Sequence, residues 1–217
     1  MGTTPHEAQR DARGKLLESV RTLDPSSVVR GQFRGYRREP GVATDSKVET
    51  FAAIRFQIDS DRWRGVPFYV RAGKALPVTA TEVRVRFKPA MGPVLDEAGL
   101  PTPNYYRFQV SPEVVIALGV GVKKSGISMV GEGIELLAHN QPPDEMAPYE
   151  RLLGDAAAGD PALFARQDSV EASWRIVDPI LGDRTPLLDY EPDTWGPPQD
   201  GTTVTPAGGW HDPACGA

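Results

Sequence analysis

Apolar and polar residues alternate along the middle of the chain. In residues 50–58, Ala52, Ile54, Phe56 and Ile58 share one side, whereas the residues between them face the other side. Four further segments, rich in β-branched and aromatic residues, have the same character: 68–71, 81–87, 105–110 and 114–122. Residues 129–138 fit a strand or a helix equally well by periodicity alone. The pattern therefore predicts five or six strands.

Helical periodicity appears on both sides of these strands. Apolar residues at helical spacing predict a helix over 5–20, capped by Thr4, and a second helix around 149–156. A third helix is expected to begin at Asp168, which can act as its N-cap. We read 31–46 as a loop with short extended pieces, 89–104 as a long connection between strands, and the proline- and glycine-rich residues 183–217 as an irregular tail.

This order of elements predicts an α+β fold, with a large, mainly antiparallel sheet backed by helices and no Rossmann domain. With 217 residues we expect one domain spanning 1–217. A net charge of −5 argues against binding to nucleic acid or to an anionic membrane surface. We find no secretory signal and no apolar run of the roughly 18 residues that cross a membrane. The single cysteine, Cys215, suits a reducing cytoplasm.

Common catalytic and cofactor motifs are not found. Gly119, Gly121 and Gly126 do not have the spacing of a dinucleotide-binding loop, so a strand ending in a turn is the better interpretation. His6, His139 and His211 have no partners at metal-ligand spacing, and no serine lies in a nucleophile elbow. Sequence alone therefore predicts no metal site and no catalytic residue in this chain.

The strongest local candidate is the corner Arg71-Ala-Gly-Lys74, because a lysine held on a tight turn after a strand can point its ammonium at hydroxyl or phosphate oxygens. A solvated turn lysine is the commoner interpretation of such a pattern. Trp195 and Trp210 could form a ligand cage, but aromatic anchors that hold the tail against the body are favoured.

Many ordered segments resemble the C-terminal domain of glucose-6-phosphate dehydrogenase. They include Val28-Val-Arg-Gly-Gln-Phe, Glu49-Thr-Phe-Ala, Arg71-Ala-Gly-Lys74, Tyr149-Glu-Arg-Leu, Glu171-Ala-Ser-Trp174 and Gly208-Gly-Trp-His. The segment that begins Tyr190-Glu-Pro-Asp-Thr-Trp is similar to actinobacterial members. The resemblance covers nearly the whole chain and favours a strand over 129–138.

The resemblance implies a function for the whole enzyme. Members of this family oxidise glucose 6-phosphate to 6-phosphogluconolactone with NADP, at the entry to the pentose phosphate pathway. Their N-terminal half is a Rossmann domain, and the motifs that grip the sugar phosphate and carry the catalytic histidine are not found in this chain. Their C-terminal half supplies one wall of the sugar site and the dimer interface.

Carried over residue by residue, the resemblance assigns substrate contacts to Lys74 and Gln109. Thr79 stands where the family usually has a second lysine or arginine, so that contact is lost or weakened. Arg71, Arg84 and Arg107 match positions that help to hold a second, structural NADP in some members. A neighbouring basic position of that site is Ala80 here, which argues against a structural nucleotide.

We therefore expect the isolated chain to be inactive, since hydride transfer needs a bound cofactor and a base within reach of the substrate hydroxyl. The leading hypothesis is a C-terminal domain that works with a Rossmann half, which is either supplied in trans or was removed. The alternatives are a non-catalytic paralogue that pairs with itself or with a full-length enzyme, and a lone sugar-phosphate-binding module. A homodimer formed through an apolar sheet face is expected.

Overall fold

The computed structural model describes residues 5–88, 103–125, 131–140, 147–198 and 203–213. The chain divides into two compact units. The first comprises Met1–Pro77 with Met146–Asp212, and the second comprises Val78–Glu145 with Pro213–Ala217. The predicted cap Thr4, most of the connection 89–104 and Cys215 lie outside the described residues. One domain for the whole chain stays a prediction.

A four-stranded sheet forms the centre of the first unit. Its strands, in spatial order, are β3 (Phe68–Gly73), β2 (Phe51–Phe56), β1 (Val28–Phe33) and β8 (Leu187–Tyr190). Pairing is antiparallel except between β1 and β8, which run parallel. The C-terminal ends of β1, β3 and β8 therefore lie at the same end of the sheet as the start of β2.

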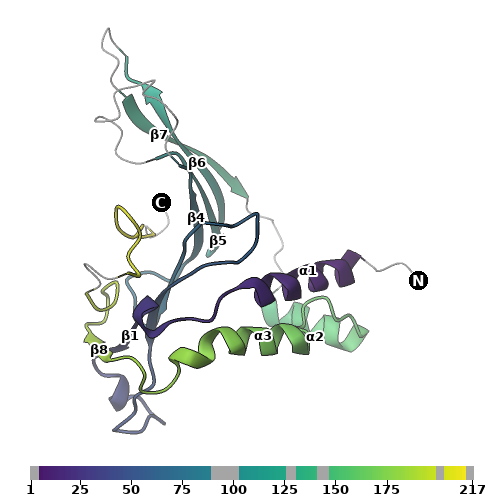
Figure 1. Ribbon diagram of the computed structural model, residues 1–217, viewed down its shortest axis with the longest axis vertical. Coiled ribbons are helices and arrows are strands. Elements are labelled where there is room, and N and C mark those ends of the chain that lie inside the picture. The colour runs from purple at the N-terminus through teal and green to yellow at the C-terminus, as the bar shows by residue number, and fades with distance from the viewer. Residues whose placement is uncertain (1–4, 89–102, 126–130, 141–146, 199–202, 214–217) are drawn as a thin grey trace. The chain divides into compact units, whose positions relative to one another are not determined.

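The helices of the first unit are α1 (Pro5–Ser19), α2 (Pro148–Ala158) and α3 (Gln167–Val177). Helices α1 and α3 lie side by side (Figure 1), with Gly14 of α1 close to the side chains of Arg166 and Ser169. Arg166 is the residue that precedes α3, so Asp168 lies in its first turn and the predicted cap at Asp168 was wrong. Short 3-10 helices are η1 (Pro25–Ser27), η2 (Tyr36–Arg38) and η4 (Asp178–Ile180).

Both faces of the first sheet are buried, which explains why β2 is apolar almost throughout. On one face, Ile54 and Phe56 pack with Val28 and with residues of α3 and η4. On the other, Phe51 and Ala53 pack with Tyr190 and with Val204 of the C-terminal segment. The C-terminal segment thus serves as the cover of one sheet face.

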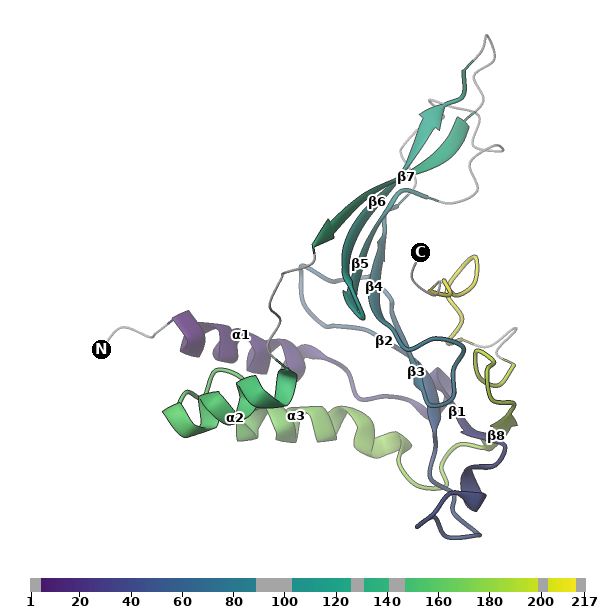
Figure 2. The ribbon, with the colours of Figure 1, turned by 180° about the vertical axis from the view of Figure 1, so that it is seen from behind.

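The second unit is built on another four-stranded sheet, antiparallel throughout (Figure 2). Its order is β4 (Thr81–Arg86), β5 (Tyr105–Ser111), β6 (Val114–Lys123) and β7 (Gly131–Asn140). Strand β7 confirms the strand favoured by the resemblance, and Gly119 and Gly121 lie inside β6, as expected for a strand rather than a nucleotide loop.

The α+β class and the mainly antiparallel pairing are confirmed, with the strands divided between two sheets. Two short strands differ from the sequence-based expectation. Strand β1 takes in the first residues of the segment read as a loop, and β8 lies inside the tail read as irregular. Strand β1 lacks a clear alternation of apolar and polar residues because two of its buried residues, Arg30 and Gln32, are polar. Strand β8 has only four residues and is stabilised by its pairing with β1. No helix among the described residues has the length and apolar character needed to cross a membrane.

Candidate functional site

The Lys74 corner is held on both sides by main-chain hydrogen bonds. The Lys74 amide donates to the carbonyl of Thr50 at 2.8 Å, and the Lys74 carbonyl accepts from the Tyr190 hydroxyl at 2.7 Å. Ala75 follows with φ of 50°, a left-handed conformation uncommon outside glycine, and its carbonyl accepts from the Asp193 amide at 2.8 Å. The backbone of this turn is therefore fixed.

The side chain of Lys74, in contrast, is uncommitted. The residue is exposed, and its ammonium has no hydrogen-bond or ion-pair partner among the described residues. A lysine ammonium carries three donors, which suits it to hydroxyl or phosphate oxygens. A fixed backbone with a free ammonium is the arrangement expected of a preformed binding lysine.

The other two predicted sugar-site residues belong to the second unit. Gln109, on β5, is 9% exposed, and its side-chain amide has no hydrogen-bond partner among the residues described. Its polar atoms are not fully buried, so they remain accessible to water or to a ligand. Thr79 is exposed and precedes β4, and its uncharged hydroxyl cannot replace a cation.

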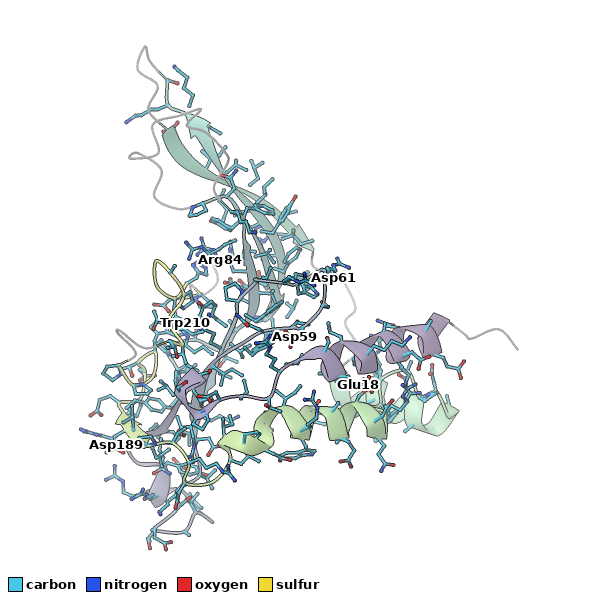
Figure 3. The ribbon with its side chains drawn as sticks, in the orientation of Figure 1. Glu18, Asp59, Asp61, Arg84, Asp189 and Trp210 are labelled. Carbon is cyan, nitrogen blue, oxygen red and sulfur yellow. The ribbon has the colours of Figure 1, made fainter. Side chains whose placement is uncertain are left out.

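Arg71 is the most enclosed of the three predicted nucleotide-binding arginines. Its guanidinium carbon lies 4.4 Å from the ring centre of Trp195 and 4.9 Å from that of Trp210. It also forms a 2.6 Å ion pair with Asp212, and its side chain is only 8% exposed. The predicted role of the tail tryptophans as anchors is confirmed, since both rings of the C-terminal segment contact Arg71 of β3. Trp210 is labelled in Figure 3.

Arg107 is committed to carboxylates of its own sheet. It forms ion pairs with Glu135 at 2.9 Å and Glu82 at 3.4 Å. These contacts, led by the hydrogen bonds that Arg107 donates to Glu135, raise the pKa of Arg107. Tyr105 donates to Glu135 at 2.8 Å, while burial and this carboxylate raise the pKa of Tyr105. Arg84 stacks on the Tyr105 ring at 3.9 Å. Arg107 is therefore paired with carboxylates and Arg84 is stacked on an aromatic ring. These contacts do not place two free cations together where a nucleotide could bind.

The two faces of the second sheet differ sharply. Its register places Glu82, Arg107 and Glu135 on one face. The opposite face, which we call the apolar sheet face, carries large hydrophobic residues that are 39–56% exposed. These are Val83, Val85, Phe87, Tyr106, Val110, Ile116, Ile134 and Leu136. Exposed apolar surfaces of this size are typical of sites that contact another protein, a membrane or a ligand.

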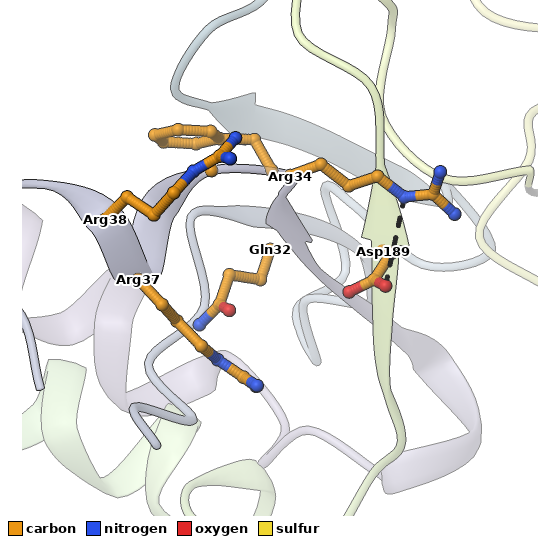
Figure 4. Close-up of a pocket in the computed structure, with 7 residues that line it drawn as sticks. Gln32, Arg34, Arg37, Arg38 and Asp189 are labelled. Atoms are coloured by element: carbon orange, nitrogen blue, oxygen red, sulfur yellow. Dashed lines mark ion pairs between the residues drawn. The ribbon is translucent and has the colours of Figure 1, made fainter. Parts of the chain in front are cut away.

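A basic pocket of about 230 Å³ lies at the edge of the first sheet where β1 and β8 end (Figure 4). Its charged lining residues are Arg34, Arg37, Arg38 and Asp189. We missed this pocket in the sequence, although three arginines within five residues around Gly35 were a visible signal. Tyr190 and Thr50, which fix the Lys74 corner, gave no sequence signal. Within the described ranges, no group of three or more His, Cys, Asp and Glu residues could hold a metal.

The comparisons with known proteins agree with one another. The family model for the glucose-6-phosphate dehydrogenase C-terminal domain matches residues 3–211. Glucose-6-phosphate 1-dehydrogenase 1 of Mycobacterium tuberculosis (strain ATCC 25618 / H37Rv) is 36% identical over 205 residues, covering 94% of this chain and 44% of that protein. The cytoplasmic isoform of Solanum tuberosum is 33% identical over 210 residues, covering 92% of this chain and 40% of the relative.

Solved structures agree with these relatives. The crystal structure of glucose-6-phosphate 1-dehydrogenase from Mycobacterium avium matches with a TM-score of 0.86 and 35% identity, over 99% of this chain and 46% of that one. A glucose-6-phosphate dehydrogenase in complex with its substrate glucose-6-phosphate matches with a TM-score of 0.75 and 30% identity, over 90% of this chain and 43% of that one. The chain thus spans less than half the length of these relatives.

Proposed function

Because this chain belongs to the glucose-6-phosphate dehydrogenase C-terminal domain family, we propose that it forms the sugar-site wall and the dimer interface of such an enzyme. Together with a nucleotide-binding Rossmann half, it would oxidise glucose 6-phosphate to 6-phosphogluconolactone with NADP, in the pentose phosphate pathway. The cytoplasm is the proposed location, as the name of the potato relative suggests.

The Lys74 corner is the observation that carries this proposal. Its backbone is held by Thr50 and Tyr190, so the point from which the flexible side chain extends is fixed before substrate arrives. The backbone therefore needs no further ordering on binding, and only the side chain must be ordered. Lys74 would donate to sugar hydroxyls. Gln109 and Thr79, which belong to the second unit, stay separate candidates for substrate contacts, as the family resemblance implies.

The chemical step itself is assigned to the other half. Hydride transfer needs a nicotinamide held against C1 of the sugar and a base that takes the C1 hydroxyl proton. NADP would bind mainly to the Rossmann half and accept the hydride there. A structural NADP at Arg71, Arg84 and Arg107 is not part of the proposal. Arg71 already forms an ion pair with Asp212, and Arg107 already forms ion pairs with Glu82 and Glu135.

The apolar sheet face would pair with the same face of a second copy. An exposed face this rich in hydrophobic residues is unfavourable in water and is best covered by an equally apolar surface. Two identical faces related by a two-fold axis satisfy that requirement, and this isologous pairing is the commonest form of oligomer. We therefore propose a homodimer.

Reconstitution tests the proposal. The Rossmann half of the Mycobacterium tuberculosis relative is fused upstream of this chain, and NADPH formation from glucose 6-phosphate is followed by absorbance. We expect activity from the fusion, none from the chain alone, and a rise in KM of at least about tenfold for Lys74→Ala, the size of one lost charge-assisted contact. Lys15→Ala, on exposed α1, is the matched control and should leave KM unchanged. A soluble, dimeric fusion without activity would contradict the proposal.

The apolar sheet face also favours a second candidate, a non-catalytic protein that pairs with a full-length dehydrogenase and adjusts its assembly. Thr79 suits this alternative, because weaker sugar binding would not impair a protein that has no catalytic function. Mixing the chain with the full-length Mycobacterium tuberculosis enzyme, followed by sedimentation, separates the two. A heterodimer together with an inactive fusion would favour the second candidate.

A further inference from the structure

We propose that the basic pocket where β1 and β8 end binds a small phosphate ester that carries a hydroxyl group. The pocket lies in the first unit and is lined by the end of β1, the turn at Gly35, helix η2 and Asp189 of β8 (Figure 4). This site is additional to the Lys74 corner and goes beyond the function proposed above.

The turn at Gly35 brings the arginines together. Gly35 has φ of 111°, which only glycine adopts readily, and it allows the chain to turn from β1 directly into η2. A Cβ at position 35 would lie 3.4 Å from a terminal nitrogen of Arg38, an ordinary contact distance, so the Arg38 guanidinium lies beside the turn and glycine is required for its backbone conformation. Arg34 before the glycine and Arg37 and Arg38 after it therefore line one pocket.

Two of these three positive charges are not neutralised. Arg34 pairs with Glu191 at 2.7 Å and with Asp189 at 4.0 Å. Arg37 donates only its Nε, to the carbonyl of Ser46 at 3.0 Å, which leaves its terminal nitrogens available. The Arg38 side chain has no hydrogen-bond or ion-pair partner in the part of the chain that the structure describes. Two free guanidinium groups match the charge of nearly −2 on a phosphate monoester and the geometry of its oxygens.

Acceptor atoms in the same pocket argue for a ligand that also has a hydroxyl. Gln32 is 4% exposed, and its amide nitrogen donates to the carbonyls of Ser46 at 3.0 Å and Val48 at 2.9 Å. Both amide hydrogens are thereby used, so the polar atom that Gln32 offers the pocket is its carbonyl oxygen. That oxygen and the Asp189 carboxylate repel a bare anion but accept hydrogen bonds from a hydroxyl. A volume of about 230 Å³ suits a small ligand rather than a dinucleotide.

Calorimetry on the 217-residue chain at low salt tests this site, with inorganic phosphate and glycerol 3-phosphate as the probes. We expect both to bind, with glycerol 3-phosphate the tighter. Arg37→Gln combined with Arg38→Gln should weaken both at least about tenfold, because two charge-assisted contacts are lost. The control pair Arg13→Gln with Lys15→Gln removes the same charge from exposed positions of α1 and should change affinity less than about twofold.

A third variant separates the anion from the hydroxyl. Asp189→Asn removes the carboxylate that opposes the anion, so inorganic phosphate should bind more tightly and the advantage of glycerol 3-phosphate should shrink. The proposal is overturned if the wild-type chain binds neither probe, or if the control pair weakens binding as much as the pocket pair. Equal affinity of the wild type for both probes would overturn the hydroxyl assignment.

Discussion

The hydroxyl of Tyr190 donates a hydrogen bond to the main-chain carbonyl of Lys74 at 2.7 Å. The same hydroxyl lies 3.0 Å from the Thr50 hydroxyl, which in turn accepts from the Phe33 amide at 2.9 Å. A continuous line of hydrogen bonds therefore joins the end of β1, the start of β2, the end of β8 and the Lys74 corner. Tyr190 is 4% exposed, and its burial raises the pKa of its hydroxyl, so it stays protonated and able to donate.

This relationship predicts the effect of Tyr190→Phe. The ring would still fill the core, but the Lys74 carbonyl would lose its donor, so we expect the free energy of unfolding to fall by about 1–2 kcal/mol. In the fusion with a Rossmann half, KM for glucose 6-phosphate should rise while kcat changes less, because Tyr190 positions Lys74 and touches no reacting atom. Urea denaturation and steady-state kinetics measure the two effects.

Tyr36→Phe is the control for Tyr190→Phe. Tyr36 packs its ring against Phe33 with centroids 5.5 Å apart, and its hydroxyl has no hydrogen-bond partner among the residues described. Loss of the Tyr36 hydroxyl should change the free energy of unfolding by less than about 0.5 kcal/mol. If both variants behave alike, the hydroxyl of Tyr190 has no special role at the Lys74 corner.

The sequence predicted what depends on local pattern. Alternation identified β2, β4, β5 and β6, and the pattern Arg71-Ala-Gly-Lys74 located a lysine on the corner after a strand; the substrate contact of Lys74 stays a prediction. The sequence could not reveal Tyr190 as the residue behind that corner, because the contact joins positions 116 residues apart. Strand β8 was missed for the same reason, since a segment of four residues becomes a strand only through its pairing with β1.

The apolar sheet face yields a prediction with a built-in control. Leu136 and Leu137 are neighbours on β7 with similar exposure, 56% and 53%, but they lie on opposite faces. Leu136→Glu places a charge on the apolar sheet face and should weaken dimerisation at least about tenfold, because an unpaired charge in an apolar interface is costly. Leu137→Glu adds the same charge to the polar face and should leave the dimer intact. Sedimentation equilibrium distinguishes them, and equal behaviour would rule out this face as the interface.

Acid should weaken the ion pair between Arg166 and Asp168 at the start of α3. Arg166 bonds both Asp11 and Asp168, and its hydrogen bonds to the Asp168 carboxylate lower the pKa of Asp168 below the ordinary value of 3.8. A lowered pKa means that the contribution is fully present above that ordinary value and is lost as the pH falls through the lowered one. The urea midpoint should therefore drop between about pH 4 and pH 2. Asp168→Asn should reduce the size of this drop, and an unchanged drop would assign it to other carboxylates.

Arg71 gives the last prediction, since it ties the C-terminal segment to β3. Arg71→Gln removes the 2.6 Å ion pair with Asp212 and the stacking on Trp195 and Trp210, so we expect a loss of about 2 kcal/mol in stability. The stability of Arg71→Lys should lie between those of the wild type and Arg71→Gln, because lysine keeps the charge but cannot stack a planar group on the indoles. Released tryptophans should shift their fluorescence to the red, and limited proteolysis should cut the segment after residue 190 sooner.

Arg62→Gln is the matched control for this loss. Arg62 lies over the Trp63 ring at 5.3 Å, but it is exposed and forms no ion pair among the described residues. Cation–π contacts at exposed sites are worth about 0.5–1 kcal/mol. Stability should therefore fall by less than for Arg71→Gln, with no change in proteolysis of the C-terminal segment. If Arg62→Gln and Arg71→Gln are equally destabilising, the enclosure of Arg71 by the two indoles adds nothing beyond a surface contact, and the segment is held by its other contacts, such as the packing of Val204 in the core.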